Sequence, residues 1–183
     1  MVAEVSKENL TRLGFLEGEE LTEEGIEMAR ALLEHVKPVP NIPTRLFRRV
    51  MGLNVPVAVE LVLIRPEDGA VFLTWREDEY WRGWHVPGSF ISPGEELIDT
   101  ARRIADNELR GVTVVSVQSI GDKNLPACPR FHAFGNLVFT ASYTGEPGEA
   151  ARGRWFTEWP EDLIEVHRPY IEIIDPYRKP RKG

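Results

Sequence analysis

The chain has 183 residues, a formal net charge of −7 at pH 7 and a pI near 5.2. This length suits one domain with an extension, and the acidic balance argues against broad affinity for nucleic acid. The single cysteine, Cys128, excludes an internal disulfide and suits a reducing compartment. No apolar run is long enough to span a membrane, and the N-terminus lacks a signal pattern. We therefore expect a cytoplasmic protein.

Residues 1–52 are predicted to form a helical N-terminal extension. One short helix over 6–13 would end at Gly14, and a second would begin at Thr22 and carry an apolar stripe made of Ile26, Ala29, Leu33 and Val36. A third short helix over 44–51 carries three arginines. The sequence L-T-E-E-G resembles a fragment of winged-helix regulators. We favour an extension that packs on the main domain or on a partner subunit, because the segment is mostly acidic and no wing is evident.

Residues 55–76 have the alternating pattern of a β-hairpin, with Asp68-Gly69 as its turn. Glu60 is the polar residue within the first strand. We expect it on a solvent face or in an ion pair, with contact to a substrate as the alternative.

The next segment, 77–85, is rich in aromatic and charged residues. Tyr80 and Trp81 are candidates for stacking on a base or sugar, with packing of the loop onto the sheet as the alternative. Trp84 is expected to pack, and His85 is expected to be structural rather than catalytic.

A Gly-rich loop and an amphipathic helix follow. Ser92 as N-cap, Pro93 at the first helical position and Glu95 in a capping box predict one helix over 93–109. Its apolar face would be made of Leu97, Ile98, Ala101, Ala105 and Leu109. Helical spacing predicts a patch beside the loop that contains Arg103, Ile104, Asn107 and Glu108.

A loop carbonyl and helix carboxylates in this arrangement can hold a hard cation that binds diphosphate oxygens. The residues resemble the Nudix box, G-x5-E-x7-R-E-U-x-E-E-x-G-U, in which U is aliphatic. Ser89 stands at the first Gly, and Glu95, Arg103 and Glu108 match the pattern. The departures are Ile104 and Asn107 in place of two glutamates and Arg110 in place of the second Gly.

Within that superfamily the chain is most similar to the GDP-mannose mannosyl hydrolase branch. Its relaxed box is matched here by Trp84, Val86, Pro87, Gly88, Arg103, Ile104, Glu108 and Leu109. The resemblance implies one divalent ion, held by a loop Gly carbonyl, the retained Glu and a downstream side chain. Glu149 stands at that downstream position, with an acidic turn as the alternative. The branch's catalytic histidine is replaced by Ala150, and Glu146 is the nearest substitute.

The remainder of the chain is predicted to complete the sheet and close the domain. Strands are expected over 113–120 and 131–143, with a loop over 121–130 between them. Lys123 and Arg130 of this loop are candidate phosphate contacts, although surface cations are common. His132 is expected to bond within the sheet rather than act as a base. A helix over 160–166 would close the domain.

The resemblance implies an α/β fold, a Nudix-type α/β/α sandwich around a mixed sheet. The expected domains are the extension 1–52, a Nudix domain 53–176 and a basic tail 177–183. The implied function is Mg²⁺-dependent (or Mn²⁺-dependent) hydrolysis of a nucleoside diphosphate linked to another moiety, such as a nucleotide sugar. The alternative is a catalytically weak or inactive nucleotide-binding or regulatory protein. A homodimer is also expected.

Specific roles follow from the same resemblance. The catalytic residues would be Glu108, Arg103 and Glu149, and the metal would be held by Gly88, Ser89, Glu95, Glu108 and Glu149. The substrate would contact Tyr80, Trp81, Lys123 and Arg130.

Overall fold

The computed structural model describes residues 6–36, 42–43, 46, 49–50, 53–125, 134–148 and 151–178, with the backbone alone for 134–137. The chain divides into two compact units, residues 1–42 and 43–183. None of the described helices is long and apolar enough to cross a membrane.

The described residues of the first unit form two helices and a short β-hairpin. Helix α1 (Lys7–Arg12) begins at Ser6, and α2 (Glu23–Glu34) begins at Thr22, whose hydroxyl accepts a hydrogen bond from the Gly25 N–H at 3.1 Å. Both helix predictions are confirmed.

The hairpin in this unit is missing from the sequence prediction. Strands β1 (Leu16–Glu17) and β2 (Glu20–Leu21) pair antiparallel between the two helices. Strands of two residues are too short for an alternating pattern to reveal. The predicted helix over 44–51 lies mostly outside the described residues.

The second unit is built on two sheets. Its strands are β3 (Val57–Val62), β4 (Val71–Glu77), β5 (Arg82–His85), β6 (Gly88–Phe90), β7 (Val112–Leu125), β8 (Phe134–Gly145) and β9 (Gly153–Phe156). One sheet is four-stranded, in the order β6-β3-β8-β7, and is mixed because β3 and β8 run parallel. The other is three-stranded and antiparallel, in the order β5-β4-β9.

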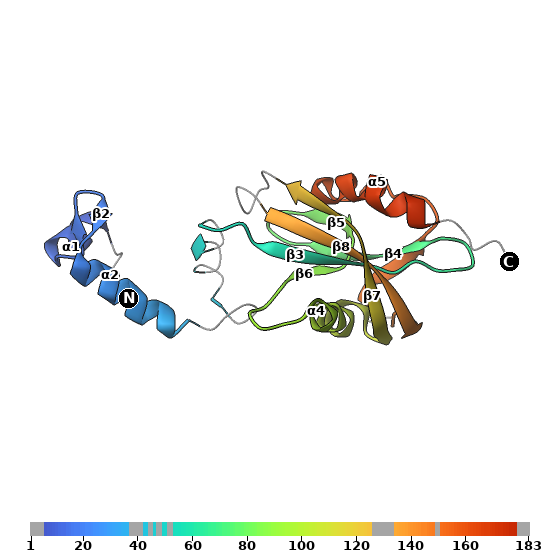
Figure 1. Ribbon diagram of the computed structural model, residues 1–183. Helices are drawn as coiled ribbons and strands as arrows, with labels where there is room; N and C mark the ends of the chain where they lie inside the picture. The colour runs from blue at the N-terminus through green and yellow to red at the C-terminus, as the bar shows by residue number, and fades with distance from the viewer. Residues whose placement is uncertain are drawn as a thin grey trace. The chain divides into compact units, whose positions relative to one another are not determined.

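Helices cover this unit on both sides (Figure 1). Helix α4 (Leu97–Ile104) lies on one side. The short helices η3 (Glu165–Tyr170), α5 (Ile171–Ile174) and η4 (Asp175–Tyr177) lie on the other. The predicted α/β fold with a mixed sheet is therefore confirmed.

Alternation along β3 divides the core in two. Val59 and Leu61 pack with Ile104 of α4, whereas Val62 packs with Tyr170 of η3. Successive side chains of a strand point to opposite faces, so the one strand contributes to both cores. Glu60 lies on the same face as Val62 and is buried, with 5% exposure. The expectation of a solvent face for Glu60 is wrong.

The predicted hairpin over 55–76 forms only at its turn. The Arg65 N–H bonds to the Ala70 carbonyl at 2.8 Å, and a single bridge joins Ile64 to Val71. Beyond the bridge, β3 and β4 separate into different sheets.

Strand β7 runs to Leu125, so residues 121–125 of the predicted loop are strand and pair with β8. The predicted helix over 160–166 is also wrong. Leu163 makes a parallel bridge with Trp84, which keeps the chain extended until the helical segment begins at Glu165.

The helix that carries the site begins later and ends differently than predicted. Gly94 has a φ of +81°, a left-handed conformation that interrupts a helix, and α4 begins only at Leu97. Ser92 is therefore not its N-cap. The continuation over Ala105–Leu109 is a π-helix, in which the Arg110 N–H reaches the Ala105 carbonyl at 2.9 Å.

Arg178 was assigned to a basic tail, but the structure anchors it to the domain. Its guanidinium donates to the Gly69 carbonyl at 3.0 Å and to Asp175 at 3.1 Å, and it also reaches the carbonyls of Phe156 and Thr157. Residues 179–183 lie outside the described part of the chain.

Candidate functional site

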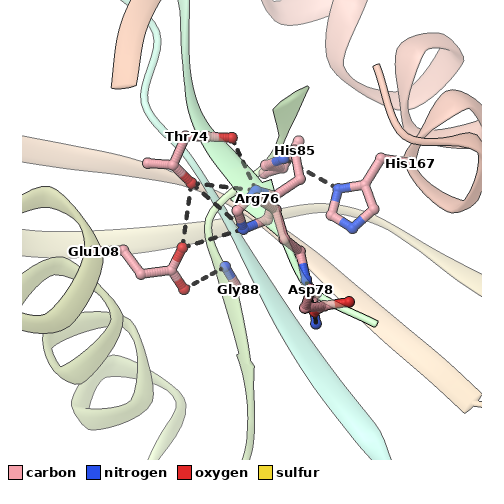
Figure 2. Close-up of polar contacts among 8 residues, drawn as sticks. Thr74, Arg76, Asp78, His85, Gly88, Glu108 and His167 are labelled. Atoms are coloured by element: carbon pink, nitrogen blue, oxygen red, sulfur yellow. Dashed lines mark hydrogen bonds and ion pairs between the residues drawn. The ribbon is translucent and has the colours of Figure 1, made fainter. Parts of the chain in front are cut away.

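Glu108 lies in the π-helical segment and points toward Gly88 at the start of β6, as Figure 2 shows. One carboxylate oxygen, Oε1, accepts the Gly88 N–H at 3.2 Å. The other, Oε2, faces β4 and β5, where it accepts the Thr74 hydroxyl at 3.3 Å. Glu108 is thus close to Gly88, as predicted, but Gly88–Phe90 form strand β6 rather than a loop.

His85 completes a group of three polar atoms on this side of Glu108. Its Nε2 lies 3.3 Å from Glu108 Oε2 and 3.4 Å from Thr74 Oγ1. Its Nδ1 lies 2.9 Å from the Thr74 carbonyl oxygen. Because a carbonyl can only accept, Nδ1 carries the proton in that bond. In the neutral ring, Nε2 then turns its lone pair toward Glu108 (Figure 2).

Arg103 of α4 and Glu95 form a clamp, here named the Arg103–Glu95 clamp, that ties the helix to β6 and to the loop after it. The guanidinium donates to both oxygens of Glu95 at 2.7 Å, to Ser89 Oγ at 2.9 Å and to the Phe90 carbonyl at 2.9 Å. The Arg103 guanidinium, together with bonds from Ser92 N–H and Thr100, lowers the pKa of Glu95 to about 2. Glu95 is therefore a charged anchor that holds the loop against the helix.

A cleft of about 570 Å³ opens beside Glu108, within the usual size range of ligand sites. Arg110 and Arg152 line it, and they are the two non-glycine residues with positive φ in the described chain, at 42° and 48°. Such backbone strain concentrates at functional sites. Two arginines and one glutamate lining one cleft suit an anionic ligand that carries a cation.

A second, smaller cavity of about 90 Å³ shares His85 with this cleft. Glu60, Arg76 and Trp81 are among the residues that line it. Glu60 Oε2 is buried without a hydrogen-bond partner among the described residues. Burial, and next the negative charge of Glu108, raises the pKa of Glu60 to about 8.

His167, from η3, supports the loop from behind. Its Nδ1 accepts the Val86 N–H at 3.1 Å, and its ring packs edge-on against His85 with centroids 5.8 Å apart. Burial lowers the pKa of His167 well below its usual value, so the ring stays neutral and keeps its acceptor. The loop that presents Gly88 is therefore held from both Glu108 and η3 (Figure 2).

The predicted site residues fall into three groups. Gly88, Ser89, Glu95, Arg103 and Glu108 lie together around the loop. Trp81 lines the smaller cavity, and the ring centroids of Tyr80 and Trp81 are 5.8 Å apart. Lys123 lies on β7, pairing with Asn136, and lines neither cavity. Arg130 and Glu149 lie outside the described residues, as do Cys128, His132 and Ala150.

Ile104 does not belong to the predicted patch. It is 1% exposed and packs in the core on the β3 side of α4. Asn107, in contrast, lines the cleft beside Glu108. Of the two positions where the box lacks a glutamate, only 107 faces the cleft.

Sequence reasoning missed four residues around Glu108: Thr74, His85, Arg110 and Arg152. Thr74 and His85 are paired in register on β4 and β5, which the sequence could have shown only with the strand pairing known. Arg110 carried a usable signal, because it stands where the box has a glycine and therefore adopts a left-handed conformation.

The comparisons with known proteins identify the family and the fold. A family model described as NUDIX domain matches residues 55–172. The low-salt glycan biosynthesis protein Agl8 of Haloferax volcanii is 40% identical over 87 residues, 46% of this chain and 53% of the relative. The chain thus matches about half the length of that relative.

Solved structures share the fold at low sequence identity. A MutT NUDIX hydrolase from Burkholderia pseudomallei has a TM-score of 0.55 at 21% identity, covering 65% of this chain and 97% of that one. A NUDIX hydrolase from Nitrosomonas europaea has a TM-score of 0.55 at 15% identity, covering 69% and 92%. With the family model matching well over half of its length, the chain belongs to the NUDIX domain family and has the fold of NUDIX hydrolases.

Proposed function

We propose that the protein hydrolyses a nucleoside diphosphate linked to another moiety, with a nucleotide sugar as the favoured substrate class, and that it uses one divalent ion. The observation that supports this most is Glu108. It is a half-buried carboxylate fixed by the Gly88 N–H at the edge of a cleft that also contains Arg110 and Arg152. A cation at Glu108 and the two guanidinium groups would together offset the charge of a diphosphate.

The site has fewer carboxylates than a full box, which bears on the reaction. Ile104 offers no oxygen, and Asn107 offers a neutral one. Water would attack either phosphorus, breaking a P–O bond, or the anomeric carbon of a sugar, breaking the C–O bond and releasing the nucleoside diphosphate. Attack at carbon needs less positive charge at phosphorus, which a single ion could supply. The glycan-related name of the Haloferax relative supports a sugar in the substrate.

The ion would be Mg²⁺ or Mn²⁺, and the divalent ion would supply electrophilic stabilisation of the diphosphate. Glu108 would hold it, and the carbonyl of Gly88 or Ser89 and the Glu149 side chain are further predicted ligands. Arg103 would keep the loop in place through Glu95. The Tyr80–Trp81 pair beside the smaller cavity would contact the base or sugar.

The experiment is a screen of nucleoside diphosphate compounds, including nucleotide sugars, with and without Mg²⁺ and Mn²⁺. Reducing sugar is read before phosphatase treatment, when sugar 1-phosphate does not react, and nucleoside mono- and diphosphate are separated, so that cleavage between the phosphates and cleavage at carbon are distinguished. Glu108→Gln should lose activity by at least about 10²-fold, and Glu158→Gln, at an exposed position in the same domain, should not. Metal-independent turnover, or full activity in Glu108→Gln, would contradict the proposal.

A second candidate is a protein that binds a nucleotide but turns it over slowly or not at all. One observation favours this candidate. Among the described residues, no group of three His, Cys, Asp or Glu side chains is placed to bind one ion. In the same screen it would show a thermal shift with a nucleotide and no product with any metal.

A further inference from the structure

We propose that His85 is a direct ligand of the divalent ion and takes the place of the carboxylates that the helix lacks. The ion would lie against a triangle formed by His85 Nε2, Glu108 Oε2 and Thr74 Oγ1. This inference rests on the proposed metal-dependent function and names the ligands and the class of ion.

The hydrogen-bonding state of His85 is the first argument. Its Nδ1 donates to the Thr74 carbonyl at 2.9 Å, so in the neutral ring Nε2 carries only a lone pair. Nε2 lies 3.3 Å from Oε2 of Glu108, a carboxylate oxygen that also carries lone pairs. Two such atoms repel unless a positive charge lies between them. A divalent ion bound between the two atoms would supply that charge.

The second argument is how the ring is oriented. A histidine that binds metal usually donates its other ring N–H to a backbone carbonyl or a carboxylate, which sets the tautomer and the ring angle. The bond from Nδ1 to the Thr74 carbonyl is of this kind. It is supported by the register of β4 and β5, which places Thr74 and His85 opposite each other. His85 also packs against His167, and its side chain is only 11% exposed, so it has little freedom to move.

The third argument is the size of the triangle. Its three sides are 3.3 Å from His85 to Glu108, 3.3 Å from Thr74 to Glu108 and 3.4 Å from Thr74 to His85. Ligand atoms about 2.1 Å from one ion are separated by about 3.0 Å in octahedral and about 3.4 Å in tetrahedral coordination. The three atoms could therefore share one ion after shifts of a few tenths of an ångström. Figure 2 shows the three side chains converging from two strands and the helix.

The ligand set predicts the class of metal. Imidazole nitrogen favours transition ions, whereas Mg²⁺ prefers oxygen ligands and retains water. The protein should therefore bind Mn²⁺ or Co²⁺ more tightly than Mg²⁺, by at least about tenfold. An ion at this position would face the cleft lined by Arg110 and Arg152, where a diphosphate could reach it.

The test is pulsed EPR on the full-length protein with stoichiometric Mn²⁺ and no nucleotide. The spectrum should show the ¹⁴N modulation of a bound imidazole, and protein labelled with ¹⁵N-histidine should show the ¹⁵N pattern instead. His85→Gln should lose the modulation and weaken Mn²⁺ binding by at least about tenfold. His35→Gln, at an exposed position of the other unit, and His132→Gln should retain both.

A spectrum of wild-type protein with water and oxygen ligands alone would overturn the proposal, and this result does not depend on whether His85→Gln folds. Retention of the nitrogen signal in a folded His85→Gln variant would also overturn it. Turnover with an all-oxygen ion would leave the proposed function standing without this ligand. Nitrogen-bound Mn²⁺ without hydrolysis of any diphosphate compound would leave the ligand standing and reject the proposed function.

Discussion

Restoring the two missing glutamates of the box should have opposite effects at the two positions. In Ile104→Glu, a side chain with 1% exposure is replaced by a carboxylate among Val59, Leu61 and Leu109. The change removes about 1.5–3 kcal/mol of apolar burial. It also buries a polar group without a partner, at about 1–3 kcal/mol. We expect the free energy of unfolding to fall by about 3–5 kcal/mol, against a typical total of about 5–15 kcal/mol.

Asn107→Glu should behave differently, because Asn107 is exposed and lines the cleft. Its effect on unfolding in chelator should stay within about 1 kcal/mol, the small loss reflecting repulsion from Glu108. Added Mn²⁺ should then stabilise this variant more than the wild type. At a free metal concentration 100 times the dissociation constant, binding adds about 2.7 kcal/mol to the free energy of unfolding. Tighter metal binding is therefore measured as added stability.

Urea unfolding followed by tryptophan fluorescence suits both variants. All five tryptophans lie between residues 75 and 159, so the signal reports on the unit that contains the site. Ile104→Leu is the matched control and should cost less than about 1.5 kcal/mol. If Ile104→Glu lost little stability, or regained it with Mn²⁺, then Ile104 would face the cleft and the assignment of this helix face would be refuted.

Three further predictions concern the support around Glu108. A double-mutant cycle of Arg103→Lys and Glu95→Gln should give a coupling energy of about 1–3 kcal/mol in urea unfolding. Lysine cannot reproduce the contact of the Arg103 guanidinium with both oxygens of Glu95. A coupling energy near zero would mean that the clamp does not hold the loop. His167→Asn keeps an acceptor near the Nδ1 position, whereas His167→Phe keeps a ring but leaves the Val86 N–H unpaired. The Asn variant should therefore retain metal affinity better than the Phe variant. The reverse order would show that packing alone matters. Between about pH 4.5 and 8, folded Glu60 holds a proton that the unfolded chain has released. The free energy of unfolding should therefore fall with rising pH by up to about 1.4 kcal/mol per pH unit. Glu60→Gln should flatten this slope, and an unchanged slope would contradict the buried, protonated state.

The sequence was sufficient for the fold and for bringing Glu95, Arg103 and Glu108 together near Gly88 and Ser89. The spacing of Glu95, Arg103 and Glu108 after a Gly-containing loop predicted the loop–helix unit, and the structure brings these residues to the loop. Sequence pattern succeeds here because the contacts are local, within about one helix length of each other. The pairing of β4 with β5, which creates the Thr74–His85 side of the site, depends on a register that no local pattern encodes.

The failure at Ile104 has a definite structural cause. Residues four apart lie on one face of an α-helix, and on that basis 104 and 108 were placed in one patch. The π-helical turn over Ala105–Leu109 bonds five residues back instead of four. This wider turn shifts the face on which Glu108 lies relative to α4, so Ile104 stays in the core while Glu108 reaches the loop. Single π-turns are rare and are not visible in hydrophobic spacing.

The charge around Glu108 offers a physical reason why a box with one cleft-facing carboxylate can still serve a diphosphate. Several clustered carboxylates repel one another and require more than one divalent ion to bring a further anion close. Here one carboxylate and two arginines line the same cleft, and Arg110 occupies the position of a box glycine at the expense of a strained backbone. Guanidinium groups contribute fixed positive charge that does not dissociate. One ion, held between Glu108 and the neutral donors His85 and Thr74, would then leave the cleft with a net positive charge before the substrate binds.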